Sequence, residues 1–132
     1  MLKLTYTETG IYLEYLAQSL EELITQRIIL AMRVSESLMV EPGRASFLLP
    51  THSPELNVLW AIADRQHDEI TLCPTDEAFI EVTLRGVWLS HRMGSEEGIF
   101  LAELRVHTER LIWRIWQASV SPQSSLTDAY RV

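Results

Sequence analysis

The stretch Phe79-Ile80-Glu81-Val82-Thr83-Leu84-Arg85 decides the fold class of this chain. Its apolar residues Ile80, Val82 and Leu84 alternate with polar ones, and it contains no proline. A period of two with β-branched residues is typical of a strand that buries one face in an antiparallel sheet. We therefore expect residues 79–85 to be extended, with the three apolar side chains buried. Gly86 follows directly and indicates a bulge or a close approach of another backbone.

The segments on either side of this stretch predict a mixture of strands and helices. Alternating runs at 2–7 and 11–15, joined by a short glycine-containing link, indicate a β-hairpin. Further strands are expected at 70–72 and 99–106, residues 45–49 are a short apolar segment ended by Pro50, and Glu41-Pro42-Gly43 is expected to be a turn. Helices are expected from Ser53-Pro54-Glu55 and from Thr108 to about Ala118. The pattern predicts an α+β fold: a mainly antiparallel β-sheet with two to three helices packed on one face.

Residues 19–35 fit two interpretations. Ser19 and Glu22 match a capping box at the start of a helix. The residues after Gln26 alternate like a strand but also fit one stripe of a helix. We favour a short helix near 19–25 followed by a strand near 26–35, because Ile28, Ile29 and Val34 prefer strands. A single helix over the whole segment is the alternative.

The size and composition of the chain suit one globular domain. The 132 residues include 47% hydrophobic and 22% charged residues. We expect a domain over residues 1–118 and a polar, mobile C-terminal tail over 119–132. Cys73 is the only cysteine, which excludes an intrachain disulfide and a cysteine-based zinc site. The N-terminus does not resemble a signal peptide, and no apolar run approaches the roughly 20 residues of a membrane span, so we expect a cytoplasmic protein.

The charge balance limits the choice of partners. The chain carries 18 acidic and 11 basic residues, for a formal net charge of −7. A negative field of this size repels the phosphate backbone of nucleic acids. We therefore expect neither a nucleic-acid partner nor a membrane partner.

Three segments of the chain resemble a known group of proteins. They are residues 45–50 (Ala-Ser-Phe-Leu-Leu-Pro), 72–76 (Leu-Cys-Pro-Thr-Asp) and 81–89 (Glu-Val-Thr-Leu-Arg-Gly-Val-Trp-Leu). With these segments the chain resembles a small family of hypothetical cyanobacterial proteins, over most of its length before the tail. The resemblance implies a cyanobacterial source and a cytoplasmic location. It implies no activity and no site residue.

No motif in the chain is typical of catalysis. The four histidines lack the short spacing of a metal site, so we expect no metal and no cofactor. Cys73 lacks the context of a nucleophile, and the five glycines form no phosphate-binding loop. The sequence therefore favours a protein that is not an enzyme, without excluding a site assembled in space.

Two functional hypotheses remain. The first is a non-enzymatic protein that acts through protein contacts and self-associates as a homodimer. Trp113 and Trp116 would lie at its interface, because their helix has too wide an apolar arc for one-sided packing. The second is a small-molecule binding domain or enzyme for an anionic ligand, which the polar residues Arg44, His52, Arg85 and His91 would hold. Convergence of these four side chains in one concave pocket would favour the second hypothesis.

Overall fold

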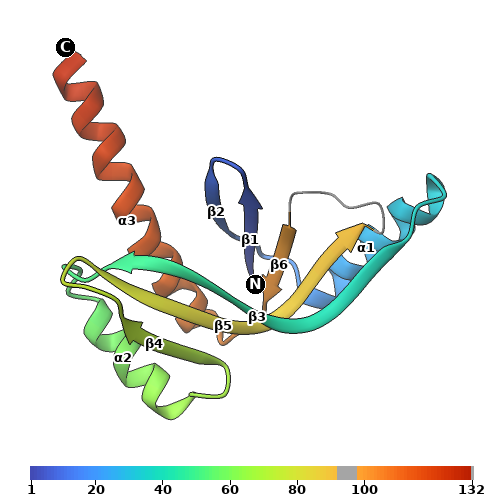
Figure 1. Cartoon of the computed structure of the whole chain (residues 1–132), viewed down its shortest axis with the longest axis horizontal. Helices are drawn as coiled ribbons and strands as arrows, with labels where there is room; N and C mark the ends of the chain where they lie inside the picture. The colour runs from blue at the N-terminus through green and yellow to red at the C-terminus, as the bar shows by residue number, and fades with distance from the viewer. Residues whose placement is uncertain (92–97, 132) are drawn as a thin grey trace.

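Six strands and three helices make up the part of the chain that the structure, a computed structural model, describes (Figure 1). The backbone is described for residues 1–91 and 98–131, and side chains for residues 1–90 and 98–119. The elements are β1 (Leu2–Thr7), β2 (Gly10–Tyr15), α1 (Leu20–Arg33), β3 (Leu38–Pro50), α2 (Leu56–Arg65), β4 (Ile70–Pro74), β5 (Phe79–His91), β6 (Gly98–Ala102) and α3 (Val106–Arg131).

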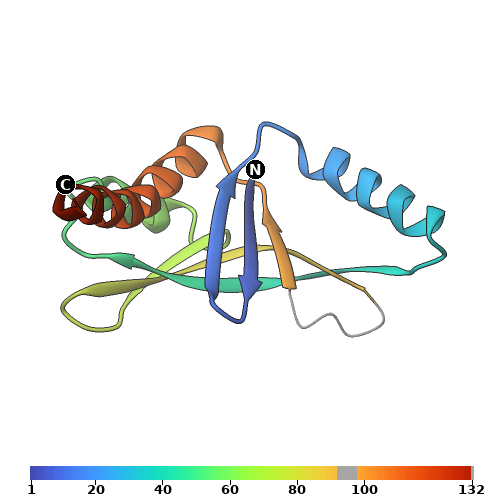
Figure 2. The same cartoon turned by 90° about the horizontal axis from the view of Figure 1, so that it is seen from above.

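The strands form one antiparallel sheet in the order β2-β1-β6-β5-β3, with β4 also pairing with β5. This confirms the predicted α+β class and the hairpin of β1 and β2. Figure 1 shows that β3 and β5 are long ribbons that run the length of the molecule. Figure 2 shows α1 near one end of these ribbons and α2 and α3 near the other. At β5 and β6 the α1 helix packs on the opposite face from α2 and α3.

The predicted strand at 79–85 is confirmed and forms the first half of β5. Ile80, Val82 and Leu84 are buried, whereas Arg85 is exposed. One edge of β5 pairs with β3 along its whole length. The other edge pairs first with β4 and then, from Val87, with β6. The β5 strand therefore pairs directly with β3, β4 and β6.

Gly86 lies where β5 changes partner from β4 to β6. A Cβ atom built on Gly86 would collide with the backbone carbonyl oxygen of Leu101 and lie 2.8 Å from Cζ of Phe100. The register between β3 and β5 continues through Gly86 without an extra residue. Of the two expectations for this glycine, the close approach is therefore confirmed, and this ladder has no bulge there.

Two apolar clusters hold the helices on the sheet. The larger one joins α2 and α3 to residues that include Phe100 and Ala102 of β6. The smaller one joins α1 to Leu101 of the same strand and to Leu89 of β5. Neighbouring side chains of β6 thus serve different clusters, as the period of two in a strand requires. An ion pair also ties β1 to α3: the amino group of Met1 lies 3.0 Å from Oε1 of Glu109, and both groups are buried.

Several local predictions were wrong, and the largest error concerns residues 26–35. They are helical: α1 runs from Leu20 to Arg33, and no strand forms there. Ser19 caps this helix as predicted, accepting a hydrogen bond of 3.2 Å from the backbone N–H of Glu22. The alternative of a single helix is therefore correct. β-Branched residues lower helix propensity only slightly, and a good cap offsets that.

The predicted turn at residues 41–43 was also wrong. Pro42 and Gly43 lie inside the 13-residue strand β3, where Pro42 pairs with Val87. A proline within a sheet is tolerated on an edge strand, because its missing N–H then faces away from the ladder. The β3 strand is such an edge, since β5 is its only partner in the described sheet.

The ends of two helices differ from the prediction. The α2 helix begins at Leu56, two residues after the predicted first position Pro54. The backbone of α3 continues to Arg131, past the predicted end near Ala118. Side chains from Val120 onward lie outside the described residues, and mobility of residues 119–132 stays a prediction.

Candidate functional site

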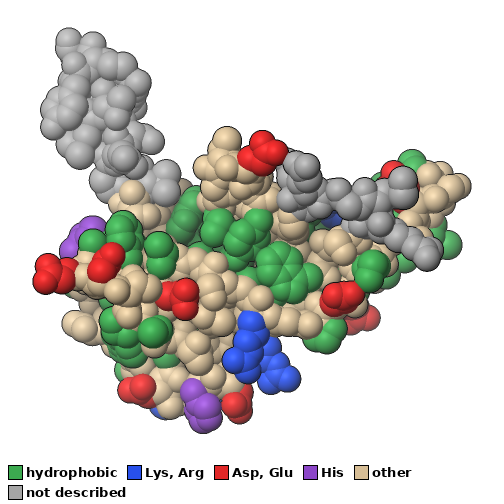
Figure 3. Space-filling model, viewed as in Figure 1, with side chains coloured by type: hydrophobic (Ala, Val, Ile, Leu, Met, Phe, Trp, Pro, Cys, Tyr) green, Lys and Arg blue, Asp and Glu red, His purple; other side chains and the backbone are tan. Residues whose placement is uncertain are grey.

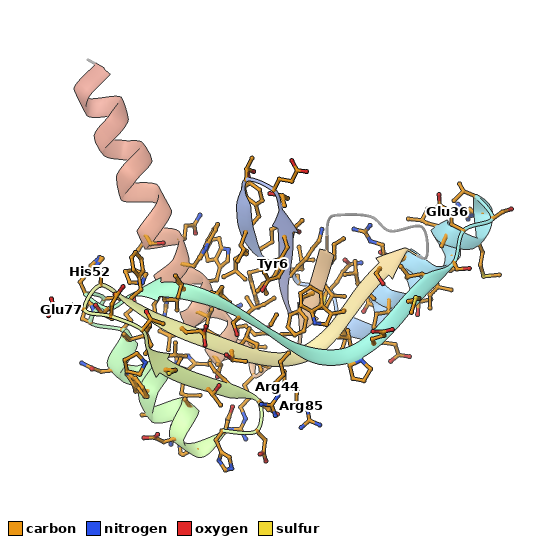
Figure 4. The ribbon with its side chains drawn as sticks, viewed as in Figure 1. Tyr6, Glu36, Arg44, His52, Glu77 and Arg85 are labelled. Carbon is orange, nitrogen blue, oxygen red and sulfur yellow. The ribbon has the colours of Figure 1, made fainter. Side chains whose placement is uncertain are left out.

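The structure brings together only two of the four residues predicted to bind an anion. Arg44 of β3 and Arg85 of β5 are direct partners in the ladder. His52 follows the far end of β3, and Figure 4 shows it beside Glu77, away from the two arginines. The backbone of His91 pairs with Leu38 at the opposite end of β5, and its side chain lies outside the described residues. These placements put the four residues at three separate points along the two strands.

Arg44 and Arg85 form an exposed basic patch on the sheet. Figure 3 shows Lys and Arg side chains at the surface where Figure 4 labels these two residues. No ion pair joins either guanidinium to another described residue. Two like charges directly opposite each other destabilise a sheet slightly. The hollow that they line with His67 is too shallow to hold a ligand.

Trp113 and Trp116, the residues predicted at a dimer interface, are partly buried by the chain itself. Both pack against the larger apolar cluster. Leu111, Ile112 and Ile115 of the same helix are fully buried in that cluster. The core therefore covers much of the arc that suggested a partner. Whether a second chain also contacts the two tryptophans stays a prediction.

The groups considered for metal binding or nucleophilic chemistry are scattered. Among the described residues, no group of three or more His, Cys, Asp or Glu side chains could hold a metal ion. Asp76 acts as a turn cap, because its Oδ1 accepts hydrogen bonds from the backbone N–H groups of Ala78 and Phe79 at 2.8 and 2.9 Å. Cys73 is exposed on β4. None of the described helices is both long enough and apolar enough to cross a membrane.

Near the middle of the sheet, Trp88 of β5 contacts Tyr6 of β1 and Phe100 of β6. The ring of Trp88 lies 5.3 Å from that of Tyr6 and 5.0 Å from that of Phe100. The indole N–H of Trp88 donates to the carbonyl of Arg44 at 3.1 Å, and the Tyr6 hydroxyl donates to the carbonyl of Ser46 at 2.9 Å. Burial raises the pKa of the Tyr6 hydroxyl above its usual value of 10.0. These donors satisfy two carbonyl groups of the edge strand β3.

A group of exposed apolar side chains lies at the other end of the molecule, on α1 and the start of β3. We call it the apolar arm. Only Leu23 and Ala31 of α1 are buried. By contrast, Met32 is 71% exposed, Val34 64% and Leu30 55%. The arm consists of Ile28, Ile29, Leu30, Met32, Val34, Met39 and Val40.

The arm projects because the chain turns sharply at its tip. Ser35 has a positive φ of 57°, and the backbone N–H of Glu36 donates to the carbonyl of Ala31 at 2.8 Å. Figure 4 shows Glu36 at the end of the molecule farthest from His52. This surface was not predicted from the sequence, because residues 26–35 were expected to form a strand. As a helix, the run is apolar on nearly all sides, which is unusual for a surface helix.

Comparison with known proteins gives one match. A protein-family model described as Alr0857-like matches residues 1–120. It agrees with the family resemblance found in the sequence. Neither the curated proteins nor the solved structures that were searched contain a match to the chain.

Proposed function

The chain belongs to the Alr0857-like family, and we propose that it acts through contacts with other protein chains, beginning with a second copy of itself. The contact surface of this proposal is the apolar arm. The proposal describes a non-enzymatic protein, and it keeps the cytoplasm as the expected compartment. It replaces Trp113 and Trp116 by α1 as the leading candidate for the interface.

The observation that carries this proposal is the exposure of the second half of α1. At about 100° per residue, Ile28, Ile29 and Met32 point away from the sheet, whereas Leu30 and Val34 point toward it. A helix that is apolar on all sides is normally buried. Contiguous exposed apolar patches on soluble proteins mark interaction surfaces. A partner that covers the arm would remove this exposure.

The amount of exposed apolar surface suits a dimer. The exposed fractions of the seven arm residues add up to roughly three and a half fully exposed side chains, worth about 1.5–3 kcal/mol each on burial. One arm could therefore contribute about 5–10 kcal/mol, and two arms about twice as much. Association of two chains costs about 4–15 kcal/mol in lost freedom. Two arms are enough to offset that cost, and a symmetric dimer is the commonest closed assembly.

Binding of an anion at the predicted Arg/His pocket has less support as the main function. Only Arg44 and Arg85 meet, and the surface around them is shallow. Small-molecule sites are usually concave and bury most of the ligand. Two exposed arginines on the surface of the sheet offer charge without enclosure.

Light scattering at micromolar concentrations tests the proposal. We expect about twice the chain mass for the natural protein and one chain mass for Met32→Glu, which places a charge in the arm. Val58→Glu is a matched control, because Val58 is 48% exposed on α2, at the other end of the sheet. It should leave the dimer intact. Since each copy carries a net charge of −7, added salt should strengthen the association by screening repulsion.

Two results would contradict the proposal. A single-chain mass for the natural protein at every accessible concentration would exclude self-association. A dimer that survives Met32→Glu would exclude the arm as its interface. In that second case, loss of the dimer in Trp116→Ala would instead assign the interface to α3.

A further inference from the structure

A cavity of about 410 Å³ lies between the inner side of α1 and the sheet. Most of its lining is apolar. Leu30, Ala31 and Val34 come from α1, and Leu38, Leu89 and Ile99 come from strands β3, β5 and β6. Thr5, Arg27, Glu36 and Ser90 make up the polar part of the lining. This volume lies within the roughly 300–1,000 Å³ that is usual for small-molecule sites.

The cavity exists because only the first half of α1 packs tightly. Leu20, Leu23 and Ile24 join the apolar cluster with Leu89 and Leu101 of the sheet. Farther along the inward stripe of the helix, Ala31 is the next buried residue, and its side chain is a single methyl group. The space is open to solvent on one side, because Leu30 and Val34 of its lining are 55% and 64% exposed. A ligand can therefore enter it without unfolding the helix.

Arg27 brings a positive charge to the wall of the cavity. Arg27 lines the cavity and is half-buried, and no hydrogen bond or ion pair joins its guanidinium to another described residue. Glu36 also lines the cavity, but it already takes part in an interaction of its own. A guanidinium binds carboxylates strongly, through two parallel hydrogen bonds. Charge complementarity thus favours a ligand with an anionic head at Arg27.

We propose that this cavity binds a linear aliphatic carboxylate, with the chain between α1 and the sheet and the carboxylate on Arg27. The apolar lining would take up the chain, at about 0.8 kcal/mol for each CH₂ group buried. Leu30 and Val34 belong both to this lining and to the apolar arm, whereas the outward residues Ile28, Ile29 and Met32 belong to the arm alone. The cavity is separate from Arg44 and Arg85, which lie on another part of the sheet.

Calorimetric titration of the full chain with decanoate tests this site. We expect saturable binding of one decanoate per chain and much weaker binding of decylamine, whose head is positive. Arg27→Gln should weaken decanoate binding by about tenfold, the equivalent of one charge-assisted hydrogen bond. Arg33→Gln is the matched control, because Arg33 is exposed on the same helix and does not line the cavity. It should bind decanoate like the natural protein.

A second variant tests the cavity itself. Ala31→Phe places a ring in the space beneath α1, so it should abolish decanoate binding while the circular dichroism spectrum stays native. If this variant does not fold, the decision rests on Arg27→Gln and on decylamine. Absence of decanoate binding, equal binding of decylamine, or an unchanged affinity in Arg27→Gln would each overturn the proposal. Met32→Glu should dissociate the dimer without abolishing binding, so failure of one proposal is distinguishable from failure of the other.

Discussion

Replacing Gly86 by alanine should destabilise the fold, because β6 leaves no room for a methyl group. The new Cβ would meet the carbonyl oxygen of Leu101, and the backbone of a buried central strand cannot move aside easily. Overpacking of this kind costs about 1–3 kcal/mol. The loss of glycine's freedom in the unfolded chain offsets about 0.4–1 kcal/mol. We expect a net loss of about 1–2 kcal/mol, which for a domain of this size lowers the melting temperature by roughly 3–10 °C.

Gly98→Ala is the matched control for this experiment. It adds the same methyl group to a neighbouring strand, but there the nearest atom is Cζ3 of the Trp88 side chain at 3.2 Å. A side chain can shift by a few tenths of an ångström, so the free energy of unfolding should change by less than about 1 kcal/mol. Urea titration of both variants measures the difference. A Gly86→Ala variant as stable as Gly98→Ala would refute the close approach of β5 and β6.

Three further predictions concern polar groups. Glu109→Ala removes the only carboxylate beside the buried Met1 amino group among the described residues, leaves it the carbonyl of Leu16 as a hydrogen-bond partner, and also removes the acceptor of the Leu104 N–H. It should lower the free energy of unfolding by about 3–5 kcal/mol, whereas Glu55→Ala, which removes the exposed pair with Arg114, should cost less than about 1 kcal/mol; equal losses in urea titrations would contradict this. Ser19→Ala should cost about 1 kcal/mol through loss of the α1 cap, and an unchanged urea midpoint would argue against that cap. Because burial raises the Tyr6 pKa, the contribution of Tyr6 to the free energy of unfolding is complete below pH 10 and is lost at higher pH. Between neutral and strongly alkaline pH, Tyr6→Phe should therefore lose less of its free energy of unfolding than the natural protein. The same dependence of that free energy on pH in both proteins would contradict the raised pKa.

The parts of the fold that were predictable are those with one consistent local pattern. Alternation at 79–85 and in the first hairpin indicated strands, and Ser19 with Glu22 indicated a helix start. Residues 26–35 were not predictable in this way, because the run fits both a strand and a helix stripe. Pro42 and Gly43 were misinterpreted because tolerance of proline depends on an edge position, which only the strand order reveals.

The candidate surfaces depend on geometry that local patterns do not contain. Arg44 and Arg85 are neighbours because of the register between β3 and β5. The exposure of Met32 depends on how far α1 diverges from the sheet. A run of apolar residues indicates that another surface covers it, but it does not show whether that surface belongs to the same chain or to a partner. The large apolar residues in the second half of α1 are the signal that could have indicated an interface.

Amide hydrogen exchange of the natural protein at two concentrations tests self-association through the apolar arm without any substitution, and it also locates the interface. Amides of residues 28–34 should exchange slowly when the protein is concentrated and faster after dilution. Amides of α2 and of the first half of β5 should exchange equally at both concentrations. Protection of α1 that does not depend on concentration, or concentration-dependent protection confined to residues 111–116, would contradict self-association through the apolar arm.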